Sequence, residues 1–139
     1  MKIFPAIDIK DKKCVRLVKG DFDNKIEYEM SPVDQAGKYK DHGFKNLHIV
    51  DLDGALTGET VNLDIIQEIV SKFDLNIEIG GGVRNFESIK KYNDAGVEKV
   101  ILGSAAIKDK NFLKEACSKF PNKIALGLDA KDGYLSVSG

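Results

Sequence analysis

Three apolar runs of this chain lead directly into aspartates, namely Asp8, Asp51 and Asp129, and Asp53 lies close to the second. A carboxylate accepts a proton and a carboxylic acid donates one, so two such groups at one pocket can act as base and acid. Like charges held close together raise one pKa, which separates the two roles. A single aspartate at a strand end is more often a turn former or a helix cap. Asp8 and Asp129, on nonadjacent strands of one sheet, are predicted to face one pocket mouth.

Small residues follow the other two apolar runs: Gly80, Gly81 and Gly82 in one case, and Gly103 and Ser104 in the other. Without a Cβ atom the chain can turn sharply and bring its amides up to a ligand. The helix expected next adds a positive N-terminus, so the junction predicts a phosphate site. The alternative is a turn in which glycine merely permits tight packing. The dinucleotide pattern G-x-G-x-x-G is not met, because residue 85 is asparagine.

The chain has two histidines and two cysteines. His42 precedes Gly43 at the expected end of a helix and is interpreted as a surface residue. His48 lies within an apolar run, where a packed, hydrogen-bonded side chain is favoured over a catalytic base. Cys14 and Cys117 are not spaced as a metal or redox pair, and both are interpreted as small apolar residues that fill space.

Five strands and four helices are expected to position these residues. The strands are residues 3–7, 46–50, 76–79, 99–102 and 123–128. The helices open at Ser31, Asn62, Asn85 and Asp109, where capping residues precede amphipathic segments. Strands and helices that alternate every ~25 to 45 residues indicate parallel strands joined by crossover helices. The strands are almost continuously apolar, which is typical of a sheet covered on both faces.

The carboxyl ends of parallel strands meet at one edge of the sheet, and ligands bind outside that edge. The aspartates and the small residues are therefore expected to gather there. A closed barrel of eight βα units needs ~250 residues, whereas this chain supplies four units and a fifth strand. The sequence thus predicts an α/β fold with a single domain over residues 1–139.

Composition narrows the range of partners. The chain is 42% hydrophobic and 31% charged, with a net charge of -1, as expected for a soluble globular domain with a core. Nucleic-acid binding is not expected, because it requires a concentrated excess of Lys and Arg. The N-terminus reaches Pro5 at once and is predicted to be neither a signal peptide nor a membrane span. A cytoplasmic location with reduced thiols follows.

Seven motifs occur in order: Pro5-Ala6-Ile7-Asp8, Cys14-Val15-Arg16-Leu17, Gly20-Asp21-Phe22, the run from His48 to Ala55, the run from Gly80 to Arg84, Gly103-Ser104-Ala105-Ala106 and Gly127-Leu128-Asp129-Ala130. Together they resemble the phosphoribosylformimino-5-aminoimidazole carboxamide ribotide isomerases of histidine biosynthesis. The first motif favours the isomerase over the similar cyclase subunit of imidazole glycerol phosphate synthase, which usually has cysteine before the corresponding residues. The bifunctional isomerase shared with tryptophan synthesis is also similar and stays open.

The resemblance implies a (βα)₈ barrel that catalyses an Amadori rearrangement of an aminoaldose, ProFAR, to an aminoketose, PRFAR. Proton transfers suffice, so neither a metal nor an organic cofactor is implied. Asp8 would be the general base that removes the C2 proton, and Asp129 the general acid that helps to open the ribose ring. The residues that would bind the phosphoribosyl substrate are Arg16, Asp51, Gly81, Gly82, Gly103 and Ser104.

The chain resembles only the N-terminal half of that family, through the fifth strand. The family's second phosphate loop and its C-terminal catalytic threonine have no counterpart. A half-barrel that is catalytically silent, and that self-associates or binds anions, is therefore the alternative. Because the first and fifth strands would have unpaired edges, we expect the 139-residue chain to form a dimer or larger assembly and to be poorly active.

Overall fold

The computed structural model describes residues 1–18, 20–131 and 133–136. Its strands are β1 (Ala6–Lys10), β2 (Lys13–Val18), β3 (Asp21–Glu27), β4 (Asn46–Asp51), β5 (Asn76–Gly80), β6 (Lys99–Leu102), β7 (Ile124–Leu126), β8 (Asp129–Lys131) and β9 (Tyr134–Ser136). Its helices are α1 (Pro32–Asp41), α2 (Leu52–Thr57), α3 (Leu63–Lys72), α4 (Phe86–Asp94), α5 (Ser104–Lys108) and α6 (Lys110–Lys119).

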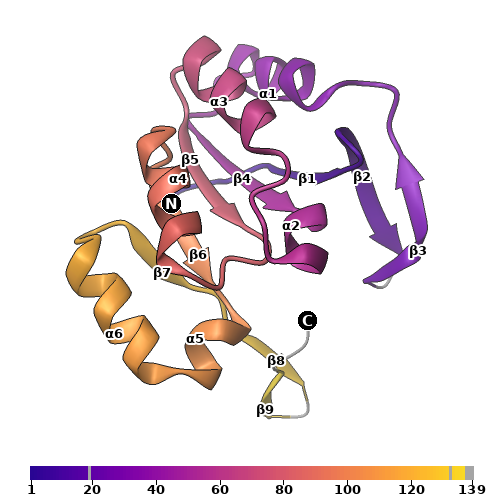
Figure 1. The fold of residues 1–139 in the computed structure, drawn as a ribbon. Helices are drawn as coiled ribbons and strands as arrows, with labels where there is room; N and C mark the ends of the chain where they lie inside the picture. Colours follow the sequence, from indigo (N-terminus) through magenta and orange to yellow (C-terminus); the bar gives the residue numbers. More distant parts are fainter. Residues whose placement is uncertain (19, 132, 137–139) are drawn as a thin grey trace.

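A seven-stranded sheet in the order β3-β2-β1-β4-β5-β6-β7 forms the centre of the molecule (Figure 1). From β1 to β7 along this order the neighbouring strands are parallel. Helices α1, α3, α4 and α6 lie between successive parallel strands in the chain, as crossover connections require. This confirms the predicted α/β fold, which has the architecture of the N-terminal part of a (βα)₈ barrel.

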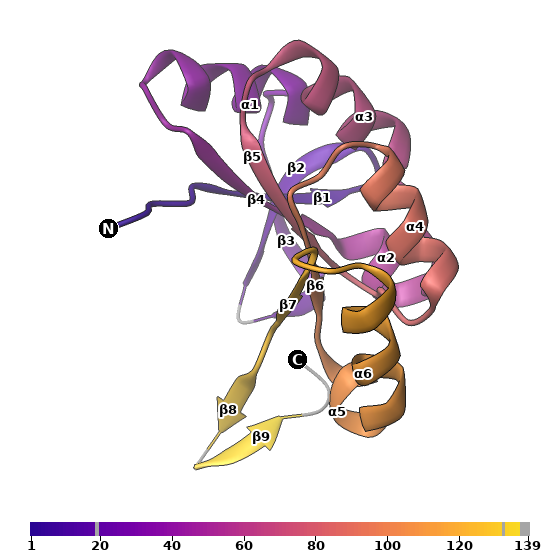
Figure 2. The same ribbon diagram turned by 90° about the vertical axis from the view of Figure 1, so that its left-hand side faces the viewer.

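The helices α1, α3, α4 and α6 all lie on one side of the sheet (Figure 2). Side chains that point to this side are fully buried, such as Ile9 and Ile49. Their neighbours on the opposite side, Asp8, His48 and Glu78, are only half-buried. The expectation of a sheet covered on both faces is therefore wrong for the described residues. The strands alternate between an apolar side under the helices and an open side that carries polar groups.

The starts of the helices agree with the capping signals in the sequence. Ser31, Asn85 and Asp109 each accept a backbone N–H of the first helical turn of α1, α4 and α6 with a side-chain oxygen. Asn62 precedes α3 as predicted but makes no capping hydrogen bond. Its side-chain amide instead donates hydrogen bonds to Asp51 and Asp53.

The strand ends differ from the expectation. The first strand begins at Ala6 rather than at residue 3, so Asp8 lies in its middle and not at its end. The fifth parallel strand ends at Leu126, and Asp129 begins β8, which pairs with β9 outside the main sheet. The glycine at residue 127 separates the two segments, a common place for a strand to break.

The hairpin formed by β2 and β3 was not predicted. Asp11 and Lys12 form the two-residue turn from β1 to β2, with φ values of 51° and 62°. Such turns usually contain Asn or Gly, so the sequence signal was weak. Because β2 pairs with Asp8, Ile9 and Lys10, the expectation of a bare first-strand edge is wrong over these residues.

The remaining predictions concern single residues and membrane segments. Cys14 is buried and His42 is exposed, as predicted. Cys117 is exposed, so its interpretation as a space-filling residue is wrong. It follows Ala116, the buried residue of α6, and one step along a helix turns a side chain by about 100° away from the core. None of the helices in the described part of the chain is long and apolar enough to cross a membrane.

Candidate functional site

A cavity of about 1000 Å³ opens at the carboxyl ends of the parallel strands. We call it the mouth cavity. Five of the predicted site residues line it: Gly81, Gly82, Gly103, Ser104 and Asp129. The sheet topology explains this meeting, because residues that follow neighbouring parallel strands necessarily lie at one edge.

Asp8 and Arg16 line a second cavity of about 450 Å³, formed by β1, β2 and α1. Burial raises the pKa of Asp8 above its ordinary value of 3.8, while the positive charges of His48 and Arg16 lower it. Because the effect of burial is the larger one, the Asp8 carboxylate is a stronger base than an exposed aspartate. The structure does not bring Asp8 and Asp129 to the walls of the same cavity.

His48 is related to both cavities, by its position in one and by its charge in the other. It lines the mouth cavity and also influences the ionisation of Asp8. Its Nδ1 atom lies 2.7 Å from Oε1 of Glu78, its partner in the register of β4 and β5. The predicted hydrogen bond of His48 is thus confirmed, whereas its side chain is half-buried at the cavity rather than packed in the interior.

The turn formed by Gly81 and Gly82 packs against the start of α2. Both residues have positive φ values, 110° and 71°. A Cβ atom on Gly81 would overlap the backbone of Asp51, and one on Gly82 would overlap the carbonyl of Gly54, well under 3.0 Å in both cases. Backbone packing therefore requires glycine at both positions. The alternative interpretation of the glycine run, a turn in which glycine permits tight packing, thus holds for Gly81 and Gly82. Gly103 differs, since a Cβ there would meet only the Gly127 carbonyl oxygen, at 4.0 Å.

Two cationic residues of the mouth cavity had no role in the sequence-based prediction. Arg84 and Lys108 both line it. Arg84 donates from Nη2 to the carbonyl oxygen of Ala55 at 2.8 Å, so it also holds α2. Two features of the sequence could have indicated these cations. Arg84 comes soon after the glycine run, and Lys108 lies four residues after Ser104, on the same face of a helix.

Asp51 lies behind the mouth cavity rather than on its wall. Its side chain is fully buried and accepts hydrogen bonds from the backbone N–H of Gly54 at 2.9 Å, from Asn62 and from the Tyr92 hydroxyl at 3.4 Å. Burial and the Asp51 carboxylate both raise the pKa of Tyr92. Because its oxygens are engaged within the protein, Asp51 supports the site instead of lining it, which corrects the expectation of a substrate contact.

The arrangement offers anion binding and proton transfer. Backbone amides of small residues, together with Arg84 and Lys108, suit a phosphate group. Asp129 in the mouth cavity and Asp8 in the second cavity have carboxyl groups, which are able to exchange protons. Within the described residues no three His, Cys, Asp or Glu side chains are grouped so that they could hold a metal ion.

Comparison with known proteins shows the family to which the chain belongs. The model of the family described as "Histidine biosynthesis protein" matches residues 2–139. A protein of Pelagibacter ubique named 1-(5-phosphoribosyl)-5-((5-phosphoribosylamino)methylideneamino)imidazole-4-carboxamide isomerase is 88% identical over 139 residues. Proteins of the same name from Clostridium kluyveri and Clostridium acetobutylicum are 50% and 48% identical.

Each of these alignments covers all of this chain and 58% of the relative. The chain therefore spans somewhat more than half the length of these curated relatives. The family match extends over nearly every residue, including the strands and turns that form the mouth cavity. The chain belongs to the histidine biosynthesis protein family.

Proposed function

We propose that this chain forms the N-terminal part of an isomerase site for the Amadori rearrangement of ProFAR to PRFAR in histidine biosynthesis. The observation that carries the proposal is the mouth cavity, where small residues, two cations and Asp129 meet. Asp8 lines the second cavity, but its register partner on β4, Val50, lines the mouth cavity. The names of the relatives support an isomerase over the cyclase alternative.

In this proposal Asp129 protonates the ring oxygen of the aminoaldose, and the ring opens to a Schiff base. Asp8 then removes the proton from C2, which gives an enolamine. Protonated Asp8 delivers a proton to C1 and the C2 hydroxyl loses its proton to the Asp129 carboxylate, so the aminoketose forms and both carboxyl groups return to their starting states. The raised pKa of Asp8 supports its role, because a stronger base removes a carbon-bound proton more readily.

One phosphate of the substrate would bind at Gly103 and Ser104, with charge supplied by Lys108 and Arg84. Gly81 and Gly82 line the same cavity and would contribute their amides. Inorganic phosphate is a direct probe: it should shift the amide resonances of Gly103 and Ser104 in a nuclear magnetic resonance titration. Lys108→Gln should weaken binding about fivefold or more, since charged hydrogen bonds are among the stronger ones. Lys114→Gln, a change of a lysine on α6 that does not line the mouth cavity, is the control and should leave binding unchanged.

A chimera tests the catalytic proposal. Residues 1–139 are joined to the C-terminal part of the Pelagibacter ubique isomerase, whose N-terminal part is 88% identical. The chimera should convert ProFAR to PRFAR. Asp8→Asn and Asp129→Asn should each lower turnover by about 10²–10⁴-fold, because the amide keeps the shape of the acid but transfers no proton. An inactive but folded chimera, or a variant with normal turnover, contradicts the assignment.

Two alternatives are tested with the same proteins. The corresponding substrate of tryptophan synthesis, offered to the chimera, distinguishes a bifunctional isomerase from one limited to histidine synthesis. The second alternative is a silent half-barrel that self-associates. It is favoured by the exposed side chains of Leu126 and Leu128 at and beyond β7. Measurable turnover by the 139-residue chain alone would exclude that alternative.

A further inference from the structure

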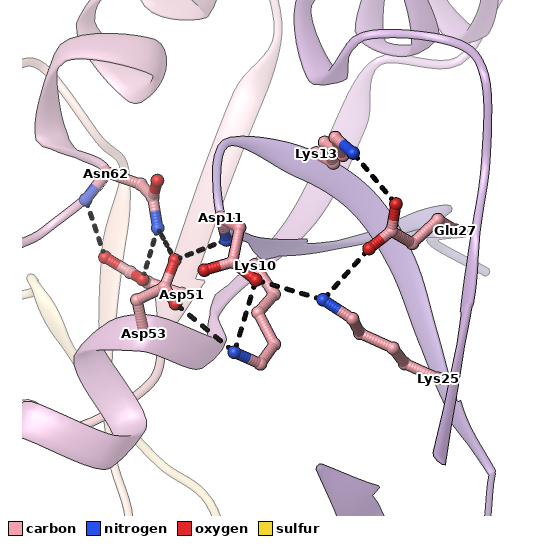
Figure 3. Close-up of polar contacts among 8 residues, drawn as sticks. All are labelled: Lys10, Asp11, Lys13, Lys25, Glu27, Asp51, Asp53 and Asn62. Atoms are coloured by element: carbon pink, nitrogen blue, oxygen red, sulfur yellow. Dashed lines mark hydrogen bonds and ion pairs between the residues drawn. The ribbon is translucent and has the colours of Figure 1, made fainter. Parts of the chain in front are cut away.

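A buried polar cluster lies behind the mouth cavity, where β1, β4 and the start of α3 approach one another (Figure 3). We call Asp51, Asp53 and Asn62 the Asn62 cluster. Asn62 is fully buried, and its Nδ2 atom donates to Oδ1 of Asp51 at 2.7 Å and to Oδ2 of Asp53 at 2.9 Å. Its backbone N–H donates to the other oxygen of Asp51 at 3.1 Å. One side-chain amide thus joins two carboxylates from different sides.

The Oδ1 atom of Asn62 is buried and has no hydrogen-bond partner among the described residues. A buried acceptor without a partner is unfavourable. The hydrogen bonds that the Asn62 amide donates must therefore stabilise the fold by more than this unpaired oxygen destabilises it. This points to Asn62 as a connector rather than as a helix cap, in keeping with its missing capping bond.

On one side the cluster holds the glycine turn. Asp51 fixes Gly54 by accepting its N–H at 2.9 Å. The backbones of Asp51 and Gly54 are the surfaces against which Gly81 and Gly82 pack without room for a Cβ atom. Any shift of Asp51 would therefore move the turn that lines the mouth cavity.

On the other side the cluster holds the hairpin. Oδ2 of Asp53 accepts the backbone N–H of Asp11 at 2.8 Å, in the turn from β1 to β2. From Asp11 a row of ion pairs continues to Lys25 at 3.0 Å and to Glu27 in β3 (Figure 3). These outer pairs are largely exposed and contribute little. The bond that Asp53 accepts is the direct link to the turn: the Asp53 side chain is only 14% exposed, whereas Asp11 lies at the surface.

The hairpin contributes to the site as well. Its residues Leu17, Gly20 and Phe22 line the mouth cavity, and Arg16 lies beside Asp8 in the second cavity. Two walls of the mouth cavity, the glycine turn and the hairpin, are therefore both attached to one asparagine side chain.

We propose that Asn62 and Asp53 are positioning residues, which fix the glycine turn and the β2–β3 hairpin relative to each other so that the mouth cavity is ready to bind phosphate. The proposal rests on the proposed function for the nature of the ligand. Binding to backbone amides depends on their preorganised geometry, so loosening the cluster should weaken binding even though neither side chain touches the ligand.

The geometry of Asp53 provides a matched pair of variants. Both bonds to Asp53, from Asp11 and from Asn62, end on the same oxygen, Oδ2. Asp53→Asn can keep both bonds with its single amide oxygen, whereas Asp53→Ala loses both. Asn62→Leu is similar in volume and removes the connection to both walls.

The variants are compared in the 139-residue chain by amide hydrogen exchange and by titration with inorganic phosphate. Asp53→Ala should speed hydrogen exchange of the β2 amides about tenfold. Asn62→Leu should also speed hydrogen exchange in β2, and it should in addition shift the amide resonances of Gly81 and Gly82. Asn62→Leu should weaken phosphate binding about fivefold or more. Asp53→Asn should resemble the unchanged protein in each measurement.

Several outcomes overturn the proposal. A folded Asn62→Leu variant with unchanged phosphate affinity shows a merely structural role, even if its melting temperature falls. If Asp53→Asn disturbs β2 as much as Asp53→Ala, the hydrogen bonds are not the link. If Asn62→Leu does not fold, the comparison of Asp53→Ala with Asp53→Asn still tests the proposal: equal hydrogen exchange of the β2 amides in the two variants would overturn it. If the unchanged chain does not bind phosphate, the proposed phosphate site fails, while the exchange measurements still decide whether the cluster holds both walls.

Discussion

Nδ1 of His48 lies 2.7 Å from Oε1 of Glu78 on the open side of the sheet, one strand away from Asp8. The contact orients the imidazole ring through Nδ1, so the other ring nitrogen, Nε2, makes no bond to Glu78. The positive charge of this histidine lowers the pKa of Asp8, against the larger effect of burial. The ionisation of the proposed general base thus depends on a histidine from the next strand.

His48→Gln should raise the pKa of Asp8 further. Glutamine can still bind Glu78, but it carries no charge that would favour the Asp8 carboxylate. The measurement is a carbon-13 titration of the Asp8 carboxyl group. His42→Gln is the control, because His42 is exposed at the end of α1. A pKa of Asp8 that stays constant or falls in His48→Gln would show that the two groups are not coupled.

Asp8→Asn should stabilise the chain at neutral pH relative to acidic pH. The folded-state pKa of Asp8 is raised, so the folded chain binds this proton more tightly than the unfolded chain does. Ionisation then lowers stability as the pH rises above the ordinary value of 3.8, and the variant avoids this loss. Urea unfolding at pH values near 3 and near 7 should show a difference between variant and unchanged chain that grows with pH. Asp74→Asn, at a fully exposed site, serves as the control.

Local signals predicted the parallel part of the fold well. Caps such as Ser31 and Asp109 and the apolar runs act over a few residues, so the sequence displays them directly. The β2–β3 hairpin was missed because Asp11 and Lys12 form a turn with positive φ values without glycine or asparagine. Their conformation is compatible with the long-range bond from the Asp11 N–H to Asp53, 42 residues away, which no local pattern reveals.

The candidate site was predicted in part for the same reason. Topology alone brings Gly103, Ser104 and Asp129 to one edge of the sheet. Whether a given aspartate faces the cavity or the protein interior depends on its exact place in the strand. Asp51 is fully buried although its position at the end of β4 resembles that of a ligand-binding residue.

Gly82→Ala should destabilise the chain by more than about 4 kcal/mol, a loss typical only of severe backbone or core disruption. The new methyl group would overlap the Gly54 carbonyl, and the φ value of 71° disfavours a side chain. Gly43→Ala is the matched control, because Gly43 also has a positive φ, 85°, but no atom lies within 4 Å of its Cβ position. It should cost about 1–2 kcal/mol. Equal losses in chemical denaturation would show that α2 does not confine the turn.

The 139-residue chain should self-associate through β7. This strand pairs with β6, and none of the described residues forms a strand on its other side. Such an edge is a template for pairing, and Leu126 and Leu128 beside it are 45% and 54% exposed. Sedimentation at micromolar concentration should therefore give a dimer or a larger species.

Leu128→Lys should shift this equilibrium toward the monomer, because the charge would have to be desolvated in a packed interface. Val61→Lys is the matched control: Val61 is similarly exposed, at 44%, but lies between α2 and α3, away from β7. A folded monomer for the unchanged chain would refute the association. A dimer that both substitutions weaken equally would place the interface elsewhere. Loss of the dimer in Leu128→Lys alone would identify β7 and the segment after it as the contact.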